Sequence, residues 1–400
     1  MRRLACAFGM AAFVAGATSI LVAQGQGQEH APIQIPDSSI ERPGDHGVAA
    51  HTNHLIRVGP SAVGTAPRGE TPASIASVYN LTALAGAGVI VIVDAFHYPT
   101  ALSDFNHFAQ QFGLPQEPST DPLSANNQVF QVVYANGKPR TNCGWAQEAA
   151  LDIEWAHAMA PNAKIVLVEA KTNSFANLFQ AVDVASSIAN TQEVSMSWGG
   201  SEFSSEAGND GHFTHPGIVY FAASGDTGGA TIYPGVSPNV VSAGGTRINR
   251  NASGTFVSET GWSGSGGGPS KYESRPSYQN IIQTIVNNAR GVPDYSFDAD
   301  PNSGVSVYDS TSCQGSSGWL VFGGTSVSSP SLAGIVNSAG SNTSSAAELS
   351  MLYQSVSNNG STINGANFRD ILGGTAGSFS AKAGWDFVTG IGSTITLSGK

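Results

Sequence analysis

Residues 323–330 read Gly323-Gly324-Thr325-Ser326-Val327-Ser328-Ser329-Pro330. An apolar, strand-like stretch (319–322) precedes them and a helix-like stretch (331–336) follows, so we expect Ser326 at a strand-to-helix junction. The glycines let the backbone turn tightly, and the free N–H groups at a helix N-terminus favour developing negative charge. Ser326 is therefore a candidate nucleophile. The alternative is a serine that only caps a helix.

A serine nucleophile needs a base, and the histidines do not offer a fitting one. Subtilisin-like proteases place theirs in a His-Gly-Thr context, whereas His46 precedes a glycine only within a Pro-, Gly- and Asp-rich stretch. Residues 145–156 lack a helix breaker and are rich in Ala, which predicts a helix with Glu148 and Asp152 on one face, about 6 Å apart. Crowding two buried carboxyls raises the pKa of one of them, so they can share a proton. The alternative is a solvated acidic face.

A third acid, Asp226, follows the apolar stretch 218–223 in a Gly-rich turn. Strand ends of parallel α/β sheets are where ligands usually bind. Burial there can keep a carboxylic acid neutral, so that it donates a hydrogen bond to an oxyanion. The alternative is an ordinary turn residue.

In this order, the three segments resemble the signature of the sedolisin family of serine-carboxyl peptidases. That signature is Glu-x-x-x-Asp on a helix, Ser-Gly-Asp after a strand and Gly-Thr-Ser-x-x-x-Pro. Further similar segments are 71–80, 91–95, 195–199, 266–279 and 290–301, so the resemblance covers essentially residues 71–395. It implies an α/β fold, a subtilisin-like single domain with a central, mostly parallel twisted sheet flanked by helices.

The resemblance also implies roles for the residues that match. Ser326 would be the nucleophile, Glu148 the base, Asp152 its hydrogen-bonding partner, and Asp226 part of the oxyanion hole with the N–H of Ser326. The reaction then needs low pH, because Asp226 must stay protonated.

The stretch Ser197-Trp198-Gly199 resembles the family's substrate-binding strand. Trp198 would line a subsite, or else be a core aromatic. Asp94 ends an early strand, and the resemblance implies a structural role for it.

One structural Ca²⁺ ion is also implied, because residues 368–392 resemble the family's C-terminal metal loop. Asp370 and Asp386 would donate carboxylates, and Ile371, Lys382 and Gly384 their backbone carbonyls, which are oxygen ligands suited to this cation.

Composition agrees with this reading. The chain has 400 residues, 40% of them hydrophobic, enough for one large core, and alternating apolar and Ala-rich segments favour a parallel α/β sheet. Only 11% are charged and the net charge is −11, so we expect no nucleic-acid partner.

The N-terminal sequence predicts where the protein is located. Residues 1–23 are typical of a secretory signal peptide, with cleavage after Ser19 or Ala23, so we expect a secreted protein, extracellular or periplasmic, without stable membrane association. The alternative is a retained membrane anchor. Beyond Cys6, the chain keeps Cys143 and Cys313, an even number that permits one disulfide in an oxidising compartment.

Residues 24–70 are rich in Gln, Gly, Pro and His and are interpreted as a linker or short N-terminal arm before the peptidase domain, 71–400. The segment is too short for the long folded propeptide that is usual in the resembling family. The domain would then fold unaided, or the arm would lie across the cleft as a vestigial inhibitor.

The leading functional hypothesis is a monomeric, secreted, acid-acting serine endopeptidase whose partners are polypeptide substrates. Two alternatives stay open: an exopeptidase of the tripeptidyl-peptidase kind on the same scaffold, and a catalytically silent binding protein.

Overall fold

The computed structural model describes residues 32–59, 64–340 and 343–400. The predicted signal peptide and Cys6 lie outside these residues.

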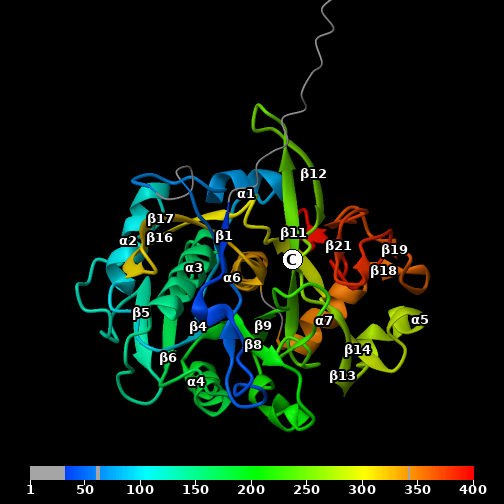
Figure 1. The fold of residues 1–400 in the computed structure, drawn as a ribbon, viewed down its shortest axis with the longest axis horizontal. Helices are drawn as coiled ribbons and strands as arrows, with labels where there is room; N and C mark the ends of the chain where they lie inside the picture. Colours follow the sequence, from blue (N-terminus) through cyan, green and yellow to red (C-terminus); the bar gives the residue numbers. More distant parts are fainter. Residues whose placement is uncertain (1–31, 60–63, 341–342) are drawn as a thin grey trace, which may run out of the picture. The chain divides into compact units, whose positions relative to one another are not determined.

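The central element is a ten-stranded sheet, in the order β20-β23-β15-β11-β9-β7-β4-β6-β5 with β12 added beside β11 (Figure 1). All neighbours from β23 to β5 are parallel, whereas β20 and β12 are antiparallel to their partners. The strands are β4 (Val89–Ala95), β5 (Phe130–Tyr134), β6 (Lys164–Ala170), β7 (Thr191–Met196), β9 (Val219–Ala223), β11 (Val241–Arg250), β12 (Phe256–Gly261), β15 (Tyr295–Asp298), β20 (Phe368–Arg369) and β23 (Ser393–Thr394). The predicted fold class is confirmed.

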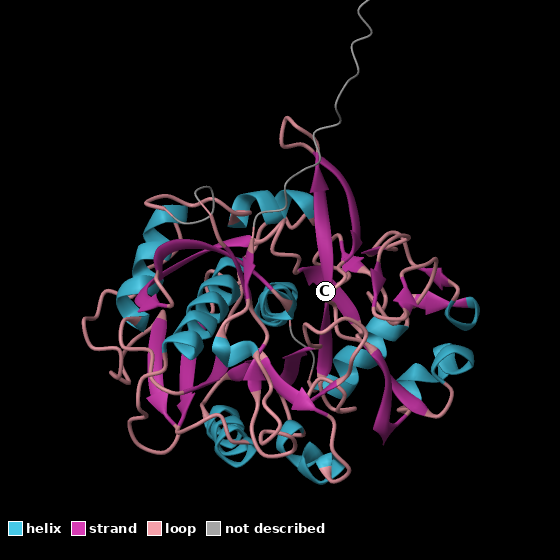
Figure 2. Ribbon diagram, viewed as in Figure 1, coloured by secondary structure: helices cyan, strands magenta, loops and turns pink. Residues whose placement is uncertain are grey.

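Helices cover both faces of this sheet, which explains why its strands are apolar throughout (Figure 2). On β4, Ile90 and Ile92 pack in the core cluster that includes helices α3 and α6, whereas Val91 and Val93 pack in the cluster that includes α4. The helices are α1 (Pro72–Val78), α2 (Ala101–Phe112), α3 (Cys143–Met159), α4 (Phe175–Ser187), α5 (Gln283–Val286), α6 (Thr325–Ala339) and α7 (Ser345–Tyr353). Short 3-10 turns are η1 (Asp37–Ser39), η2 (Glu206–Phe213), η3 (Ser277–Ile282) and η4 (Asn358–Gly360).

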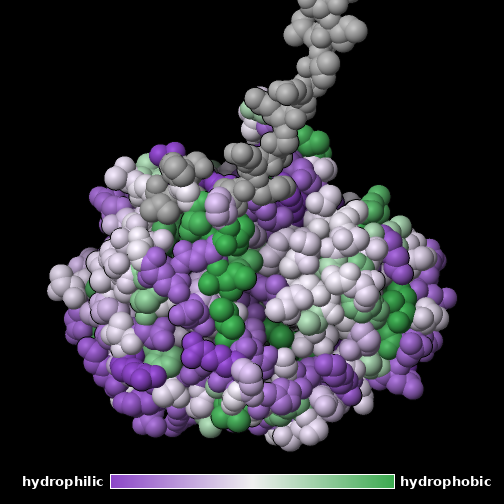
Figure 3. Space-filling view, viewed as in Figure 1, coloured by the Kyte–Doolittle hydropathy of each residue, from purple (hydrophilic) through white to green (hydrophobic). Residues whose placement is uncertain are grey.

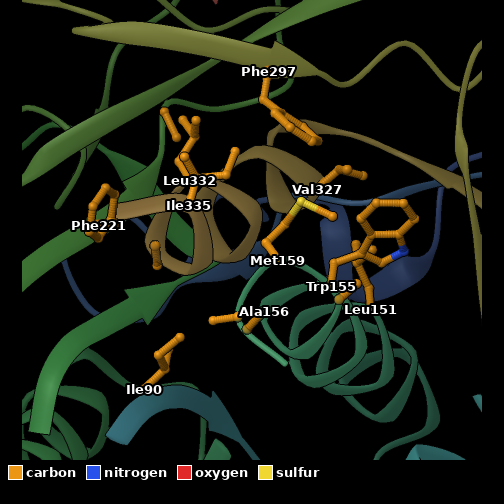
Figure 4. Packing of buried hydrophobic residues seen from close by; sticks show 14 of the residues in the cluster. Ile90, Leu151, Trp155, Ala156, Met159, Phe221, Phe297, Val327, Leu332 and Ile335 are labelled. Carbon is orange, nitrogen blue, oxygen red and sulfur yellow. The ribbon is translucent and has the colours of Figure 1, made fainter. Parts of the chain in front are cut away.

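Helices α3 and α6 lie side by side and pack directly against each other. Figure 4 shows Trp155 and Met159 of α3 next to Val327 of α6, with strand residues such as Phe221 closing the cluster. Residues 144–159 of α3 and 325–337 of α6 are all buried. Both helices are therefore core elements without a solvent face.

Two smaller sheets bring the N-terminal segment onto the body of the fold. One has the order β1-β3-β17-β16 and the other β10-β8-β2. Their strands are β1 (Ile33–Gln34), β2 (His51–Thr52), β3 (Leu55–Arg57), β8 (Trp198–Ser201), β10 (Ile232–Tyr233), β16 (Val305–Cys313) and β17 (Ser316–Gly323). Residues 32–59, which we call the arm, thus pair with strands of the body.

Three hairpin-like pairs complete the described fold. They are β13 (Gly268–Ser274) with β14 (Ala289–Val292), β18 (Val356–Ser357) with β19 (Thr362–Ile363), and β21 (Thr375–Ala376) with β22 (Phe379–Ser380).

The arm carries several of the exposed apolar side chains: Ile33, Ile35, Ile40 and Val48. Figure 3 shows a band of apolar surface on the face where β1 lies in Figure 1. Within the described residues, none of the helices has the length and apolar character needed to span a bilayer.

Candidate active site

Ser326 lies at the junction of β17 and α6, as the sequence predicts. Gly324 immediately before the helix has φ +102°, and a Cβ there would clash with the backbone carbonyl of Asn53 and with the carboxyl of Asp226. Only glycine fits such a position. The Oγ of Ser326 donates to the carbonyl of Ser197 at 3.2 Å, and its backbone N–H donates to the carbonyl of Asn53 at 3.0 Å.

Glu148 and Asp152 project from α3, which begins after Asn142, whose side chain accepts from the N–H groups of Gly144 and Trp145. Both carboxyls are fully buried. Burial raises the pKa of Glu148 to about 8, against the lowering effect of a hydrogen bond with Ser326. Burial, and then the charge of Glu148, raise the pKa of Asp152 well above its usual range. The structure therefore brings the predicted base pair to the predicted nucleophile.

Asp94 and Glu169 extend this acidic group, which the sequence analysis did not foresee. Asp94 is 1% exposed, and neither of its carboxyl oxygens has a hydrogen-bond partner. Burial, followed by the charges of Asp152, Glu148 and Glu169, raises its pKa well above the usual range. Residues 94 and 169 are aligned on the adjacent strands β4 and β6. Asp94 is the penultimate residue of β4, and its place near the end of this Val- and Ile-rich strand is the sequence feature that pointed to it.

Asp226 faces the other side of the Ser326 turn. Its Oδ1 accepts hydrogen bonds from the N–H and the hydroxyl of Thr325, both at 2.8 Å. Its Oδ2 is buried without a partner, beside Gly324 and the carbonyl of Asn53. Burial raises the pKa of Asp226 to about 8, so the carboxyl holds its proton in acid and can donate a hydrogen bond from Oδ2.

The arm lies directly against these groups. Strand β2 pairs antiparallel with β8, with His51 opposite Gly199 and Thr52 opposite Trp198. The N–H of Asn53 then donates to the carbonyl of Ser197 at 3.1 Å. The predicted Ser197-Trp198-Gly199 strand therefore binds an extended chain by main-chain hydrogen bonds.

Beyond Asn53, the arm continues along β17. Leu55 lies opposite Gly323 and Ile56 opposite Phe322. Between the two paired segments, the Nδ1 of His54 lies 2.6 Å from Oε2 of Glu148, with both side chains fully buried. Burial lowers the pKa of His54 to about 3. This contact was missed from sequence because nothing in the local pattern around residue 54 distinguishes it from the other histidines of the arm.

The indole of Trp198 is fully buried within the core cluster around α4. Its Nε1 donates to the carbonyl of Val93 at 2.8 Å. The backbone of Trp198 pairs with the arm, while its ring packs among Phe175 and Phe179.

The predicted calcium loop brings both aspartates to neighbouring turns. Asp370 accepts the N–H of Gly384 at 3.0 Å, and Asp386 accepts that of Lys382 at 2.9 Å. Among the described residues, no hydrogen bond reaches the carbonyl oxygens of Ile371, Lys382 or Gly384. No group of three or more Asp, Glu, His or Cys residues in this part of the chain is arranged for a metal. Two carboxylates with three free carbonyls nevertheless suit a hard cation.

Cys143 and Cys313 form a disulfide, with Cα atoms 5.3 Å apart. Cys143 is the first residue of α3 and Cys313 the last of β16. The bridge therefore ties the helix that carries Glu148 to the strand hairpin that precedes Ser326.

Two known proteins are similar to this chain in sequence. The chain is 27% identical to sedolisin of Pseudomonas sp. (strain 101) over 381 residues, covering 83% of this chain and 60% of that protein. It is 31% identical to kumamolisin of Bacillus sp. (strain MN-32) over 373 residues, covering 83% of this chain and 63% of that protein. The chain thus spans about three fifths of the length of these two relatives.

The fold is similar to that of a Pseudomonas sedolisin, a serine-carboxyl proteinase, solved in complex with two molecules of pseudo-iodotyrostatin. The TM-score is 0.68 at 24% sequence identity, covering 83% of this chain and 96% of that one. No family model matches the chain. The chain is thus similar in sequence to sedolisin and kumamolisin, and similar in fold to a sedolisin.

Proposed function

We propose that this chain is a secreted, acid-acting serine endopeptidase that cleaves polypeptides through an acyl-enzyme on Ser326. The observation that carries the proposal is the arm itself. The backbone N–H of Asn53 in the arm donates to the carbonyl of Ser197, and the carbonyl of Asn53 accepts a hydrogen bond from the backbone N–H of Ser326. That is the arrangement in which a serine hydroxyl attacks a peptide carbonyl while an N–H group stabilises the oxyanion.

The buried acids supply the proton transfers. Burial keeps Glu148 mostly protonated in acid, so it would act as the base in the minor fraction of molecules in which the group formed by Glu148, Asp152 and Asp94 carries a negative charge. In that form Glu148 would take the proton of Ser326 and later deliver it to the leaving amine. Asp226 would donate a hydrogen bond to the oxyanion only while it is protonated. Because its pKa is raised to about 8, the oxyanion hole is complete in acid and is lost as the pH rises through that value.

The course of the arm favours endopeptidase over tripeptidyl-peptidase action. Upstream of His51, the chain continues through Ala50, whose N–H donates to the carbonyl of Asn173 at 2.9 Å, and Ala49, which bridges to Ser174. An enzyme that removes tripeptides must close its cleft three residues before the cleaved bond. Here the cleft admits further residues on that side.

One structural Ca²⁺ ion is part of this proposal. Asp370 and Asp386, with the carbonyls of Ile371, Lys382 and Gly384, would hold it. When bound, the ion would cross-link two C-terminal turns and so stabilise the fold.

Digestion of denatured casein tests the function. The wild-type chain should digest casein at about pH 4, and Ser326→Ala should lower the rate by at least about a thousandfold. Glu148→Gln should lower it similarly with the fold intact. Casein digestion that survives Ser326→Ala, or that occurs only in alkali, would contradict the proposal. A peptide with a blocked N-terminus should be cut as fast as a free one, whereas a tripeptidyl-peptidase would spare it.

A further inference from the structure

The buried acids of the candidate active site continue across the central sheet as a row. Asp94 on β4 and Glu169 on β6 are aligned partners of adjacent parallel strands. Each lies two residues after a member of the core cluster that includes α3, namely Ile92 and Leu167, so both side chains leave the sheet on the face that α3 covers. The charges of Glu169 and of both acids on α3 act on Asp94. Four carboxyl groups thus lie together on one face of the sheet.

The last acid of this row, Glu169, is hydrogen-bonded to a histidine that reaches the surface. The Nδ1 of His97 lies 2.8 Å from Oε2 and 3.1 Å from Oε1 of Glu169, and the N–H of Tyr98 donates to Oε1 at 3.0 Å. The side chain of Glu169 is 1% exposed, whereas that of His97 is 13% exposed and lines a cavity of about 360 Å³. His97 can therefore exchange a proton with solvent, while its partner lies among the buried acids.

Positive charge is scarce along this row. Within the described part of the chain, His54 and His97 are the basic side chains that lie within ion-pair distance of the four acids. His54 belongs to the arm and has a pKa lowered by burial to about 3, so it stays uncharged in mild acid. Lys138, which is exposed, acts on the charges of both His97 and Glu169. Burial raises the pKa of Tyr134, whose ring lies 5.7 Å from that of His97, so this phenol stays neutral.

The charge of the His97–Glu169 pair falls in two steps as the pH rises. Burial, and then the charge of Lys138, lower the pKa of His97 from its usual value of 6.5. Burial raises the pKa of Glu169 to about 8. Below both values the pair carries one positive charge, because the ring is protonated and the carboxyl is neutral. Between them the pair is uncharged, and above the second value it is negative.

We propose that His97 is a pH-dependent counter-charge for the proposed base: in acid its protonated ring, held by Glu169, stabilises the negative charge shared by Glu148 and its neighbouring acids. The inference rests on the proposed peptidase function. That negative charge is the state in which Glu148 takes the proton of Ser326, so a larger fraction of molecules is active while His97 is charged. His97 does not touch the reacting atoms, and it acts as a positioning residue.

The size of the effect follows from the distance between the charges. Two strand spacings separate the ring from the middle of the row by about 10 Å. At an effective dielectric constant of about 20, a unit charge at that distance changes an ionisation equilibrium roughly tenfold. The counter-charge should therefore change the active fraction, and with it kcat, by about that factor.

The test combines kinetics on a peptide substrate with an NMR titration of the His97 ring in the full chain. His97→Gln keeps an N–H donor for Glu169 but cannot titrate. Its kcat should be about tenfold below that of the wild type at pH values below the midpoint of the ring, and should approach the wild-type value above it, with KM unchanged. His97→Arg stays charged, so it should match the wild type in acid and exceed it by about tenfold near pH 7.

A matched control is available in His212, whose Nδ1 lies 2.7 Å from Oδ1 of Asp183. It is a second histidine–carboxylate pair, on η2 and α4 and outside the acid row. His212→Gln should therefore match the wild type at every pH.

The outcomes separate this role from the function on which it rests. A ratio of wild-type to His97→Gln activity that is the same at every pH would overturn the counter-charge and leave the peptidase standing. A change confined to KM would overturn it as well, because His97 would then belong to a substrate subsite. If His97→Gln does not fold, His97→Arg decides, since equal activity of this variant and the wild type near pH 7 rejects the proposal. A folded wild-type chain whose His97 titrates below pH 6.5, but which digests casein at no pH, would overturn the peptidase itself.

Discussion

Acid should loosen the arm, and His54 is the residue through which this should happen. The docked side chain is fully buried, with a pKa lowered to about 3 from the value of 6.5 that the free residue has. It is surrounded by Glu148 and Gln147 of α3, by the ring of Phe322 and by Asp226 beside Gly324. Burial raises the pKa of Glu148 and that of Asp226 to about 8. Below that pH both neighbours are mostly protonated, so they provide little negative charge to stabilise a proton on the ring of His54.

The sign follows from linkage. The undocked His54 binds a proton below pH 6.5, while the docked one does not until about pH 3, so docking is fully favourable above the first value and weakens as the pH falls towards the second. Between about pH 6.5 and pH 4, the loss amounts to about 3 kcal/mol, or roughly a hundredfold in the docking equilibrium. Carboxyl groups whose pKa rises when the arm docks have the opposite effect, because they make docking more favourable as the pH falls.

A pair of variants isolates the histidine. In a Ser326→Ala background, which prevents cleavage, the arm of the chain with His54 is compared with that of His54→Phe, which keeps a ring against Phe322 but cannot titrate. Hydrogen exchange of the amide of Asn53, corrected for its intrinsic rate, reports docking because that N–H is bonded to Ser197 only in the docked arm. The carboxyl contributions occur in both chains and cancel in the difference between their pH dependences.

The expected difference is about 3 kcal/mol, with the His54 chain losing more protection in acid. If His54→Phe loses as much protection as the chain with His54, or if acid strengthens the histidine-bearing arm relative to it, the reasoning is refuted.

Three further predictions concern the proposed site and its supports. Asp226→Asn keeps a neutral donor at every pH, so the loss of activity expected as the pH rises through about 8 should vanish from the pH–rate profile; an unchanged profile would reject the donor role. Replacing Cys143 and Cys313 by Ala opens a loop with a sequence separation of 170 and should remove up to about 5 kcal/mol of unfolding free energy in a urea titration, whereas no loss would deny the bridge a role. EDTA should lower the melting temperature of the wild type but not that of Asp386→Asn, and equal shifts in both would argue against this ion site.

The elements that carry the proposed catalytic residues were predictable because each is encoded locally. Glu148 and Asp152 lie on a helix that composition alone predicts, and Ser326 follows a strand and two glycines that force the turn. The alternation of apolar strands and helices was sufficient for the parallel sheet, since its central strands are buried on both faces.

The path of the arm was not predictable in the same way. Its strands β1, β2 and β3 have only two or three residues, too few for a periodic pattern. Their register is set by partners far along the chain, as in the 94-residue separation of His54 and Glu148. A segment rich in Gly and Pro has the same composition whether it is free or bound to the body of the fold, so composition does not distinguish these two states.

The close packing of α3 against α6 bears on how this protein can evolve. A methyl group on Gly334 would lie 2.7 Å from Cβ of Met159 and 2.8 Å from the carbonyl of Ala156, so the two helices cannot move apart or together without new clashes or voids. Glu148 lies on α3 and Ser326 lies on α6. The packing of the two helices therefore fixes the distance between these two side chains. We expect new substrate preferences to arise instead from changes in the loops around the site.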